Sequence, residues 1–194
     1  RISGLHVGYT SFNSALMRQV IDKYNVKRVY DPCAGWGERM MTCGKLGVSY
    51  EGCDINSELF DGYKKLYGLI DGFKPVLHNN DSANQLVTGD ADAIITCPPY
   101  KGIEVYTDNG AENLSDEEFA AWWSKVVENC TYSKAKVFAV QTNQACRKVF
   151  ADALEAQGWE FKEELVFDNN QKSHFHRVSG MTKREYESML VFTR

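Results

Sequence analysis

Four short groups of residues in this 194-residue chain have types and spacing that could build a binding or catalytic site. Asp-Pro-Cys-Ala-Gly-Trp-Gly occupies residues 31–37, and Asp54 follows after a second β-prone segment. Asp81-Ser82 comes next, and Cys-Pro-Pro-Tyr occupies residues 97–100. Each group follows a short segment that favours a β-strand, so the four together predict one site at the ends of several strands.

The first two groups suit a nucleoside. Gly35 and Gly37 tolerate the dihedral angles of a tight turn and let the backbone pass close to a ligand. A carboxylate at Asp54 could take two hydroxyls of a ribose, as in dinucleotide-binding folds. Taken alone, a Gly-x-Gly pair can be only a tight turn, and Asp54 or Asp81 can be a helix-entry or loop residue. Their order on successive strand ends favours the binding site.

The fourth group suits an aromatic amino group, although a Pro-Pro pair alone usually only ends a strand. The lone pair of such an amine is delocalised into the ring, so a site that methylates it needs acceptors for the amino hydrogens. Pro98 has no N–H, and its fixed geometry can aim a carbonyl into the site. Tyr100 can stack on the base. A base inside a duplex would first have to be flipped out.

Alternating strand and helix signals place these groups at one edge of a sheet. The strands are expected at residues 26–30, 49–53, 74–77, 91–96, 135–140, 160–167 and 185–193. Between the first five, apolar residues recur at helical spacing, with Ser57 as an N-cap and Ser115 and Glu118 as a capping box. This alternation predicts a mostly parallel sheet with helices on both faces. The last two strands have no helix between them and are expected to pair antiparallel.

Composition agrees with one soluble globular domain, since 43% of residues are hydrophobic and 25% are charged. A net charge of -4 argues against holding nucleic acid by bulk electrostatics alone. The six cysteines show no Cys-x-x-Cys pair, and no Cys/His cluster has zinc spacing, so we expect no metal. Reduced thiols and the lack of a signal peptide or long apolar run predict a cytoplasmic protein without a membrane partner.

These motifs resemble those of the amino-group DNA methyltransferases, which methylate adenine N6 or cytosine N4. Residues 31–37 look like motif I, and residues 97–100 look like motif IV, usually written with Asp, Asn or Ser before Pro-Pro-Tyr. The order, with Phe12-Asn13 ahead of motif I, resembles the gamma class. Residues 103–106 and 173–175 resemble the small phage and prophage-type DNA methylases. The resemblance covers nearly the whole chain, and it is specific at the two motifs and looser elsewhere.

The resemblance implies the class I methyltransferase fold, a Rossmann-like α/β three-layer sandwich. Its seven-stranded sheet is mostly parallel with an antiparallel last strand. Residues 1–194 would form a single S-adenosylmethionine-dependent methyltransferase domain without a separate target recognition domain. Sequence specificity would then come from loops, from a short recognition site, or from an additional domain or subunit. DNA would be the partner.

The resemblance also assigns the site residue by residue. Motif I would line the methionine part of S-adenosylmethionine, Asp54 would bind the ribose, and Ile55 would pack on the adenine. The cofactor-binding set is Phe12, Asn13, Asp31, Ala34, Gly35, Gly37, Asp54, Ile55, Asp81 and Ser82. The residues that would hold the target base are Cys97, Pro98, Pro99 and Tyr100.

Contacts to nucleic acid are expected just after motif IV and in the partly basic segment between the last two strands. The residues are Lys101, Tyr106, Lys172, His174, His176 and Arg177. A solvated hairpin loop is the alternative interpretation of the basic segment. Trp122 and Trp123 lie in a strongly periodic helix, so we expect both to pack in the core. The aromatic residues expected to be exposed are Tyr100, Tyr106 and Trp36.

Cys97 departs from the family pattern, because a thiol is a weak acceptor. The amino group would then rely more on the Pro98 carbonyl. Since Cys is nearly the size of Ser, which is common in cytosine-N4 enzymes, this slightly favours cytosine.

Several alternatives remain at this point. RNA could be the substrate, because nothing in the sequence tests for a 2′-hydroxyl. Methylation of protein glutamine usually shows Asn before Pro-Pro-Tyr, so Cys97 counts against it. A non-catalytic methyltransferase-fold subunit of a larger modification complex is another alternative. An NAD-binding domain is least supported, since no complete Gly-x-Gly-x-x-Gly opens the first helix.

Overall fold

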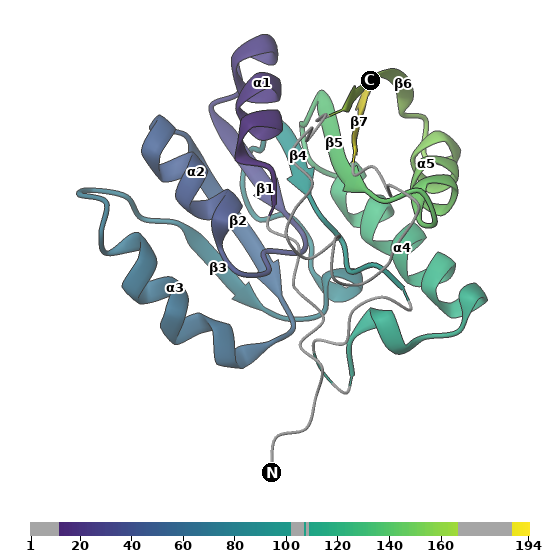
Figure 1. The fold of residues 1–194 in the computed structure, drawn as a ribbon, viewed down its shortest axis with the longest axis horizontal. Helices are drawn as coiled ribbons and strands as arrows, with labels where there is room; N and C mark the ends of the chain where they lie inside the picture. The colour runs from purple at the N-terminus through teal and green to yellow at the C-terminus, as the bar shows by residue number, and fades with distance from the viewer. Residues whose placement is uncertain (1–11, 102–106, 108, 167–187) are drawn as a thin grey trace, which may run out of the picture.

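The computed structural model describes residues 12–101, 107, 109–166 and 188–194. Within these ranges, seven strands form one sheet in the order β3-β2-β1-β4-β5-β7-β6 (Figure 1). The strands are β1 Arg28–Asp31, β2 Ser49–Asp54, β3 Val76–Asn79, β4 Ala93–Thr96, β5 Val137–Thr142, β6 Glu160–Val166 and β7 Ser188–Thr193. Strands β1 to β5 pair in parallel, whereas β7 runs antiparallel between β5 and β6. The antiparallel pairing predicted for the last two strands is confirmed.

Helices cover both faces of this sheet and complete a three-layer arrangement (Figure 1). They are α1 Ser14–Tyr24, α2 Glu38–Leu46, α3 Phe60–Tyr67, α4 Asp116–Thr131 and α5 Arg147–Ala156, with short 3-10 turns η1 Ser57–Leu59, η2 Ser82–Asn84 and η3 Ala111–Asn113. Ile94 and Ile95, neighbours in β4, belong to opposite apolar clusters because successive strand side chains point to opposite faces. One cluster packs under α1 to α3 and the other under α4 and α5.

Local chemistry explains where the helices begin and end. The predicted capping box at the start of α4 is confirmed, since Ser115 and Glu118 each accept the other's backbone N–H. Gly47 ends α2 in the left-handed region. The predicted N-cap at Ser57 is wrong. Asn56 caps the following turn instead, because its side-chain oxygen accepts the N–H of Glu58 at 3.0 Å.

Four strands begin two residues later than predicted, namely β1, β3, β4 and β5. Backbone constraints explain the shift in two of them. The N–H of Val26 bonds to the carbonyl of Ile21 at 3.0 Å, so Val26 closes α1 and β1 begins at Arg28. Pro75 has no N–H to donate, and pairing of β3 with β2 begins at Val76. Likewise β5 pairs with β4 only from Val137 onward.

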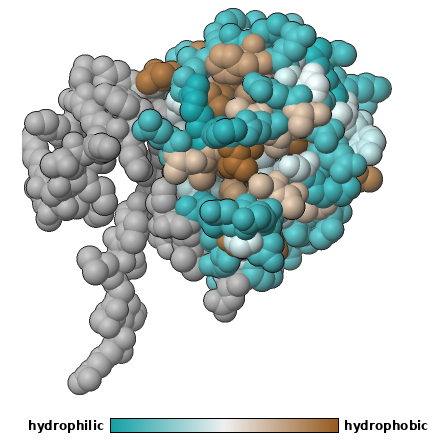
Figure 2. Space-filling view, turned by 90° about the vertical axis from the view of Figure 1, so that its right-hand side faces the viewer, coloured by the Kyte–Doolittle hydropathy of each residue, from teal (hydrophilic) through white to brown (hydrophobic). Residues whose placement is uncertain are grey.

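The outer surface beside α4 and α5 mixes apolar and hydrophilic side chains (Figure 2). Exposed apolar residues on these elements and on β6 include Tyr132, Phe161 and Val166. Such scattered apolar exposure is ordinary for a folded domain. No helix within the described ranges is both long enough and apolar enough to cross a bilayer.

Candidate active site

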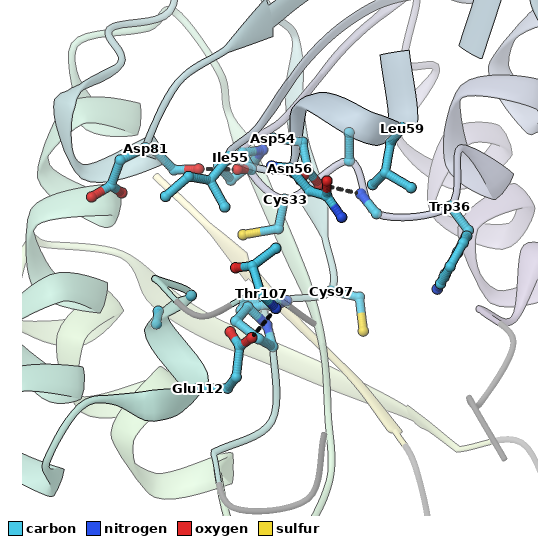
Figure 3. Close-up of a pocket in the computed structure, with 18 of the residues that line it drawn as sticks. Cys33, Trp36, Asp54, Ile55, Asn56, Leu59, Asp81, Cys97, Thr107 and Glu112 are labelled. Atoms are coloured by element: carbon cyan, nitrogen blue, oxygen red, sulfur yellow. Dashed lines mark hydrogen bonds between the residues drawn. The ribbon is translucent and has the colours of Figure 1, made fainter. Parts of the chain in front are cut away.

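A cavity of about 510 Å³ lies where the carboxyl ends of β1, β2 and β4 meet, and Figure 3 shows the residues around it. All four groups singled out in the sequence contribute to its wall. The predicted site residues found there are Phe12, Ala34, Gly35, Asp54, Ile55, Asp81, Ser82, Cys97, Pro98 and Pro99. The fold therefore brings together segments that are far apart in the sequence, as expected for the strand ends of a parallel sheet.

Asp31 lies beneath the cavity and forms a buried hub. Its fully buried carboxylate receives hydrogen bonds from Arg39 Nε at 2.6 Å, the Tyr50 hydroxyl at 2.8 Å, the Thr96 hydroxyl at 2.8 Å and the Cys33 N–H at 3.2 Å. These donors occupy the carboxylate oxygens. The expectation that Asp31 contacts the cofactor directly is therefore corrected. Its hydrogen bonds instead connect β1 to β2, β4 and α2, beneath the loop of residues 32–37, which we call the glycine loop.

Arg39 connects this hub to the cavity wall. Its guanidinium donates to the Cys33 carbonyl and lies 4.7 Å from the centroid of the Phe12 ring. The N–H of Phe12 donates to Glu38 Oε2 at 2.7 Å, so the start of the described chain is tied to the first turn of α2. Asn13, expected at the cofactor, is instead the N-cap of α1, where its side chain accepts the N–H groups of the first turn.

The two glycines of the loop have different roles. Gly35 has a φ of +55°, lines the cavity, and donates its N–H to Asp54 Oδ2 at 2.7 Å. Gly37 has a φ of +83° at the start of α2, where an added Cβ would lie 3.3 Å from side-chain atoms of Tyr63 and Leu66. Gly37 is thus needed for packing against α3, and the described cavity wall does not include it.

Asp54 ends β2 with its carboxylate held by backbone groups. Besides Gly35, the N–H of Asn56 donates to Asp54 Oδ1 at 2.9 Å. Burial raises the pKa of Asp54, and the two backbone N–H groups partly offset that rise. Next to it Ile55 is 36% exposed and presents apolar surface at the cavity.

Asp81 follows β3 and is positioned by α4. Its Oδ1 accepts the N–H of Ala83 at 3.0 Å and the indole Nε1–H of Trp122 at 2.9 Å. Trp122 packs against the apolar cluster under α4, as predicted, but it is only half-buried and also lines the cavity. Trp123 is fully buried as predicted. Since neighbouring helical residues cannot share one direction, a Trp-Trp pair could have signalled this division.

Motif IV is divided between the cavity and the core. Cys97, Pro98 and Pro99 line the cavity. Tyr100 is only 3% exposed and lies in the apolar cluster under α4, so the expectation of an exposed, base-stacking Tyr100 is contradicted. The Cys97 thiol donates to its hydroxyl at 3.6 Å. Trp36, by contrast, is 54% exposed at the cavity, as predicted.

The predicted nucleic-acid contacts are mostly outside the described residues. Tyr106, Lys172, His174, His176 and Arg177 all lie there. Lys101 is described, and it forms an ion pair with Asp116 at the start of α4 rather than lining the cavity. The described ranges contain no group of three or more side chains placed to hold a metal ion.

Sequence reasoning missed the segment that follows motif IV. Part of the cavity wall is formed by Thr107, Asn109, Gly110, Ala111, Glu112 and Leu114. Of these, Glu112 is 6% exposed. No motif marks these residues. The only signal in the sequence is an acidic residue in a short polar loop before a capping box, which is common on protein surfaces.

The sequence matches no protein-family model and no curated protein sequence. The structure does resemble solved structures. An S-adenosylmethionine-dependent methyltransferase from Clostridium acetobutylicum has a TM-score of 0.62 at 11% identity, covering 93% of this chain and 89% of its own. TrmN from Thermus thermophilus has a TM-score of 0.67 at 13% identity, covering 95% and 50%. Magnesium protoporphyrin IX methyltransferase from Synechocystis, with bound SAM, has a TM-score of 0.61 at 13% identity, covering 96% and 86%.

Identities this low establish the shared fold alone. Together with the strand order, they show that the chain has the class I methyltransferase fold, a Rossmann-like three-layer α/β sandwich. The fold class expected from the sequence is thereby confirmed.

Proposed function

We propose that this protein transfers a methyl group from S-adenosylmethionine to the exocyclic amino group of a DNA base, at adenine N6 or cytosine N4. One observation carries the proposal: a single cavity joins the glycine loop and Asp54 to Cys97, Pro98 and Pro99. The first set suits a nucleoside, and the second suits an aromatic amine. The class I methyltransferase fold supports the same reaction type.

The charge of the cavity wall suits this cofactor. The acidic residues of the described wall are Glu38, Asp54, Glu58, Asp81 and Glu112. Its guanidinium group, Arg39, is already paired with Asp31. A wall of this sign attracts the sulfonium and ammonium groups of S-adenosylmethionine, whereas it would repel the pyrophosphate of NAD. The charge of the wall therefore does not support the NAD-binding alternative.

Individual residues can be assigned to parts of the cofactor. Each oxygen of Asp54 accepts one backbone N–H and keeps further acceptor capacity, which we assign to the two ribose hydroxyls. Ile55 offers apolar surface to the adenine ring. Asp81 and Ser82, held by Trp122 and by the carbonyl of Pro32, are assigned to the adenine edge.

When bound, the cofactor supplies an electrophilic methyl group beside motif IV. The chain must then hold the amine and accept its hydrogens. Pro98 lines the cavity, and we assign its carbonyl as one acceptor. Cys97 contributes little as an acceptor, because a thiol is weak in that role. Since Tyr100 is buried, we assign the stacking of a planar base to the exposed ring of Trp36.

DNA is proposed as the substrate because of the motif resemblance. A base must leave the duplex to enter a cavity of this kind. The described wall is acidic, so it does not supply attraction to phosphate. We assign that attraction to Lys172 and Arg177, which are not among the described residues, or to an additional domain or subunit.

Transfer of labelled methyl from S-adenosylmethionine to unmodified DNA, with matched RNA alongside, tests the proposal. Digestion to nucleosides and mass identification would reveal N6-methyladenine or N4-methylcytosine. Label on RNA alone would keep the reaction and change the substrate. Cofactor binding without label on either nucleic acid would favour a non-catalytic subunit.

A further inference from the structure

The cavity wall formed by Thr107 and Glu112 carries a buried hydroxyl and a buried carboxylate. In Figure 3 the two residues lie on the other side of the cavity from Asp54 and Ile55. They are therefore separated from the residues assigned to the cofactor, and they lie on the side of the cavity that is left for the substrate.

The position of the Glu112 carboxylate is fixed by its own loop. Glu112 Oε1 accepts the N–H of Thr107 at 3.2 Å. The carboxylate also packs on Gly110, where an added Cβ would clash with Glu112 Oε2. Gly110 has a φ of -73°, which any residue adopts, so a larger residue here would act only by displacing the Glu112 carboxylate.

The hydrogen bonds that hold Thr107 in the loop use its backbone N–H and carbonyl and do not use its side-chain hydroxyl. Its N–H is bonded to Glu112, and its carbonyl accepts Asn113 Nδ2 at 2.7 Å and the Gly110 N–H at 3.3 Å. The hydroxyl oxygen is buried and has no hydrogen-bond partner among the described residues. Buried hydroxyls are nearly always bonded in folded proteins, so one in a cavity wall can be satisfied by a water that a bound ligand would replace.

A carboxylate beside a hydroxyl matches one edge of an amino-bearing base. The carboxylate can accept from an exocyclic amino group, as acidic residues do from cytosine N4. The hydroxyl can donate to the unprotonated ring nitrogen next to that amine. Adenine and cytosine both present this pair, whereas thymine has no amino group. The same carboxylate supplies the strong acceptor that Cys97 lacks.

We propose, building on the function above, that Glu112 is a catalytic residue that accepts the target amino group and that Thr107 recognises the adjacent ring nitrogen. The amine nitrogen forms a bond to the methyl carbon as the carbon–sulfur bond breaks. The electron pair of that bond stays on sulfur, which changes from sulfonium to thioether. Glu112 takes the proton that the nitrogen gives up, and the product is a secondary amine.

Glu112→Gln tests the role in catalysis. The amide oxygen can still accept the Thr107 N–H, so the loop is preserved, but the side chain no longer takes up a proton. We expect kcat to fall about 100-fold or more, as for loss of a general base, with an unchanged KM for the cofactor. The acid limb of the pH–rate profile should disappear, and Glu112→Asp should recover part of kcat.

Two further variants serve as matched comparisons. Gly110→Ala leaves Glu112 in place but pushes its carboxylate out of position, so it should reproduce the kcat loss of Glu112→Gln. Glu117→Gln changes an exposed glutamate of α4 outside the cavity wall, and its rates should equal those of the parent protein. A purely structural role for Glu112 would lower stability in Glu112→Gln without altering the pH profile.

Thr107 is tested by Thr107→Val, which keeps the shape and removes the hydroxyl, and by Thr107→Ser, which keeps the hydroxyl. We expect Thr107→Val to be at least as stable as the parent, since the hydroxyl has no hydrogen-bond partner among the described residues. We also expect it to raise KM for nucleic acid about tenfold. Thr107→Ser should keep the parent KM. Marked destabilisation of Thr107→Val would show a structural partner and contradict the assignment.

The outcomes separate this inference from the proposed function. If the parent methylates DNA and Glu112→Gln keeps its kcat and pH profile, the inference is overturned and the function stands. If the parent methylates no nucleic acid, the inference is tested by oligonucleotide binding instead. With S-adenosylhomocysteine present, the parent should prefer single-stranded oligonucleotides of dA or dC over dT, and Glu112→Gln should lose that preference. Equal binding to all three by the parent would overturn the inference.

Discussion

Asp54 stands at the carboxyl end of β2 with its carboxylate fixed by the N–H groups of Gly35 and Asn56. The same glycine loop that shapes the cavity therefore orients the acceptor assigned to the ribose. We therefore expect cofactor binding to require no rearrangement of this side chain. A change at Asp54 should consequently act on cofactor affinity more than on the fold.

Asp54→Ala should weaken binding of S-adenosylmethionine about 10- to 100-fold, since hydrogen bonds to a charged group contribute about 1.5–3 kcal/mol. Isothermal titration calorimetry measures the change. Asp61→Ala is the matched control, because the Asp61 side chain on α3 is 87% exposed and outside the wall. Equal affinities for parent and Asp54→Ala would remove Asp54 from the cofactor site.

The affinity should also depend on pH through Asp54. Burial raises its pKa above that of an exposed aspartate, and the ionised form is the better acceptor. Cofactor affinity should therefore fall as the pH is lowered through this raised pKa, before exposed aspartates titrate. Asp54→Asn should bind more weakly and lose this part of the pH dependence. A pH series of dissociation constants for both proteins measures it, and identical slopes would contradict the prediction.

Trp36 is the exposed aromatic residue of the glycine loop, and we assign it to base stacking. Trp36→Ala should raise the KM for nucleic acid about 5- to 100-fold, since stacking on an aromatic side chain contributes about 1–3 kcal/mol per base. Cofactor affinity should change little. Tyr132→Ala, at the far end of α4 and 72% exposed, is the control. A loss confined to cofactor binding would reassign Trp36.

At the scale of elements, the buried Asp31–Arg39 pair is what joins β1, β2, β4 and α2 under the cavity. Burial and the nearby Asp31 charge raise the pKa of the Tyr50 hydroxyl, which keeps it a donor to this carboxylate. The hub thereby fixes the positions of the strand ends that carry the glycine loop and motif IV.

Asp31→Ala should lower the free energy of unfolding by about 3–5 kcal/mol, because it leaves the Arg39 guanidinium buried without its partner. Urea denaturation measures the loss. Asp22→Ala on α1, whose side chain is 64% exposed in an ion pair with Arg18, should cost about 1 kcal/mol or less. A similar small loss for Asp31→Ala would mean that the hub does not hold the strand ends together.

At the scale of the whole molecule, local sequence signals were sufficient for the architecture. Alternating apolar segments and caps predicted the strands, their antiparallel end and the carboxyl edge at which Asp54, Asp81 and Cys97 meet. The predicted starts of β1 and β3 were too early, because Val26 bonds back to α1 and Pro75 has no N–H to donate. Hydrophobic patterning contains no signal for either effect.

The parts of the site that sequence reasoning missed depend on tertiary packing. Tyr100 turns into the core because α4 supplies an apolar cluster behind motif IV. Trp122 reaches Asp81 across 41 residues, a contact that helical periodicity cannot reveal. Glu112 and Thr107 have no motif, and only the folded loop buries them at the cavity.

The central claim is that the cavity at the carboxyl ends of β1, β2 and β4 binds S-adenosylmethionine beside motif IV. Irradiating the protein with methyl-labelled S-adenosylmethionine, followed by peptide mapping, tests it most directly. We predict label in peptides that carry the cavity wall, around residues 32–39, 54–59 or 97–99, with S-adenosylhomocysteine preventing it. Label that this competitor prevents but that maps to the outer faces of α4, α5 or β6 would contradict the account.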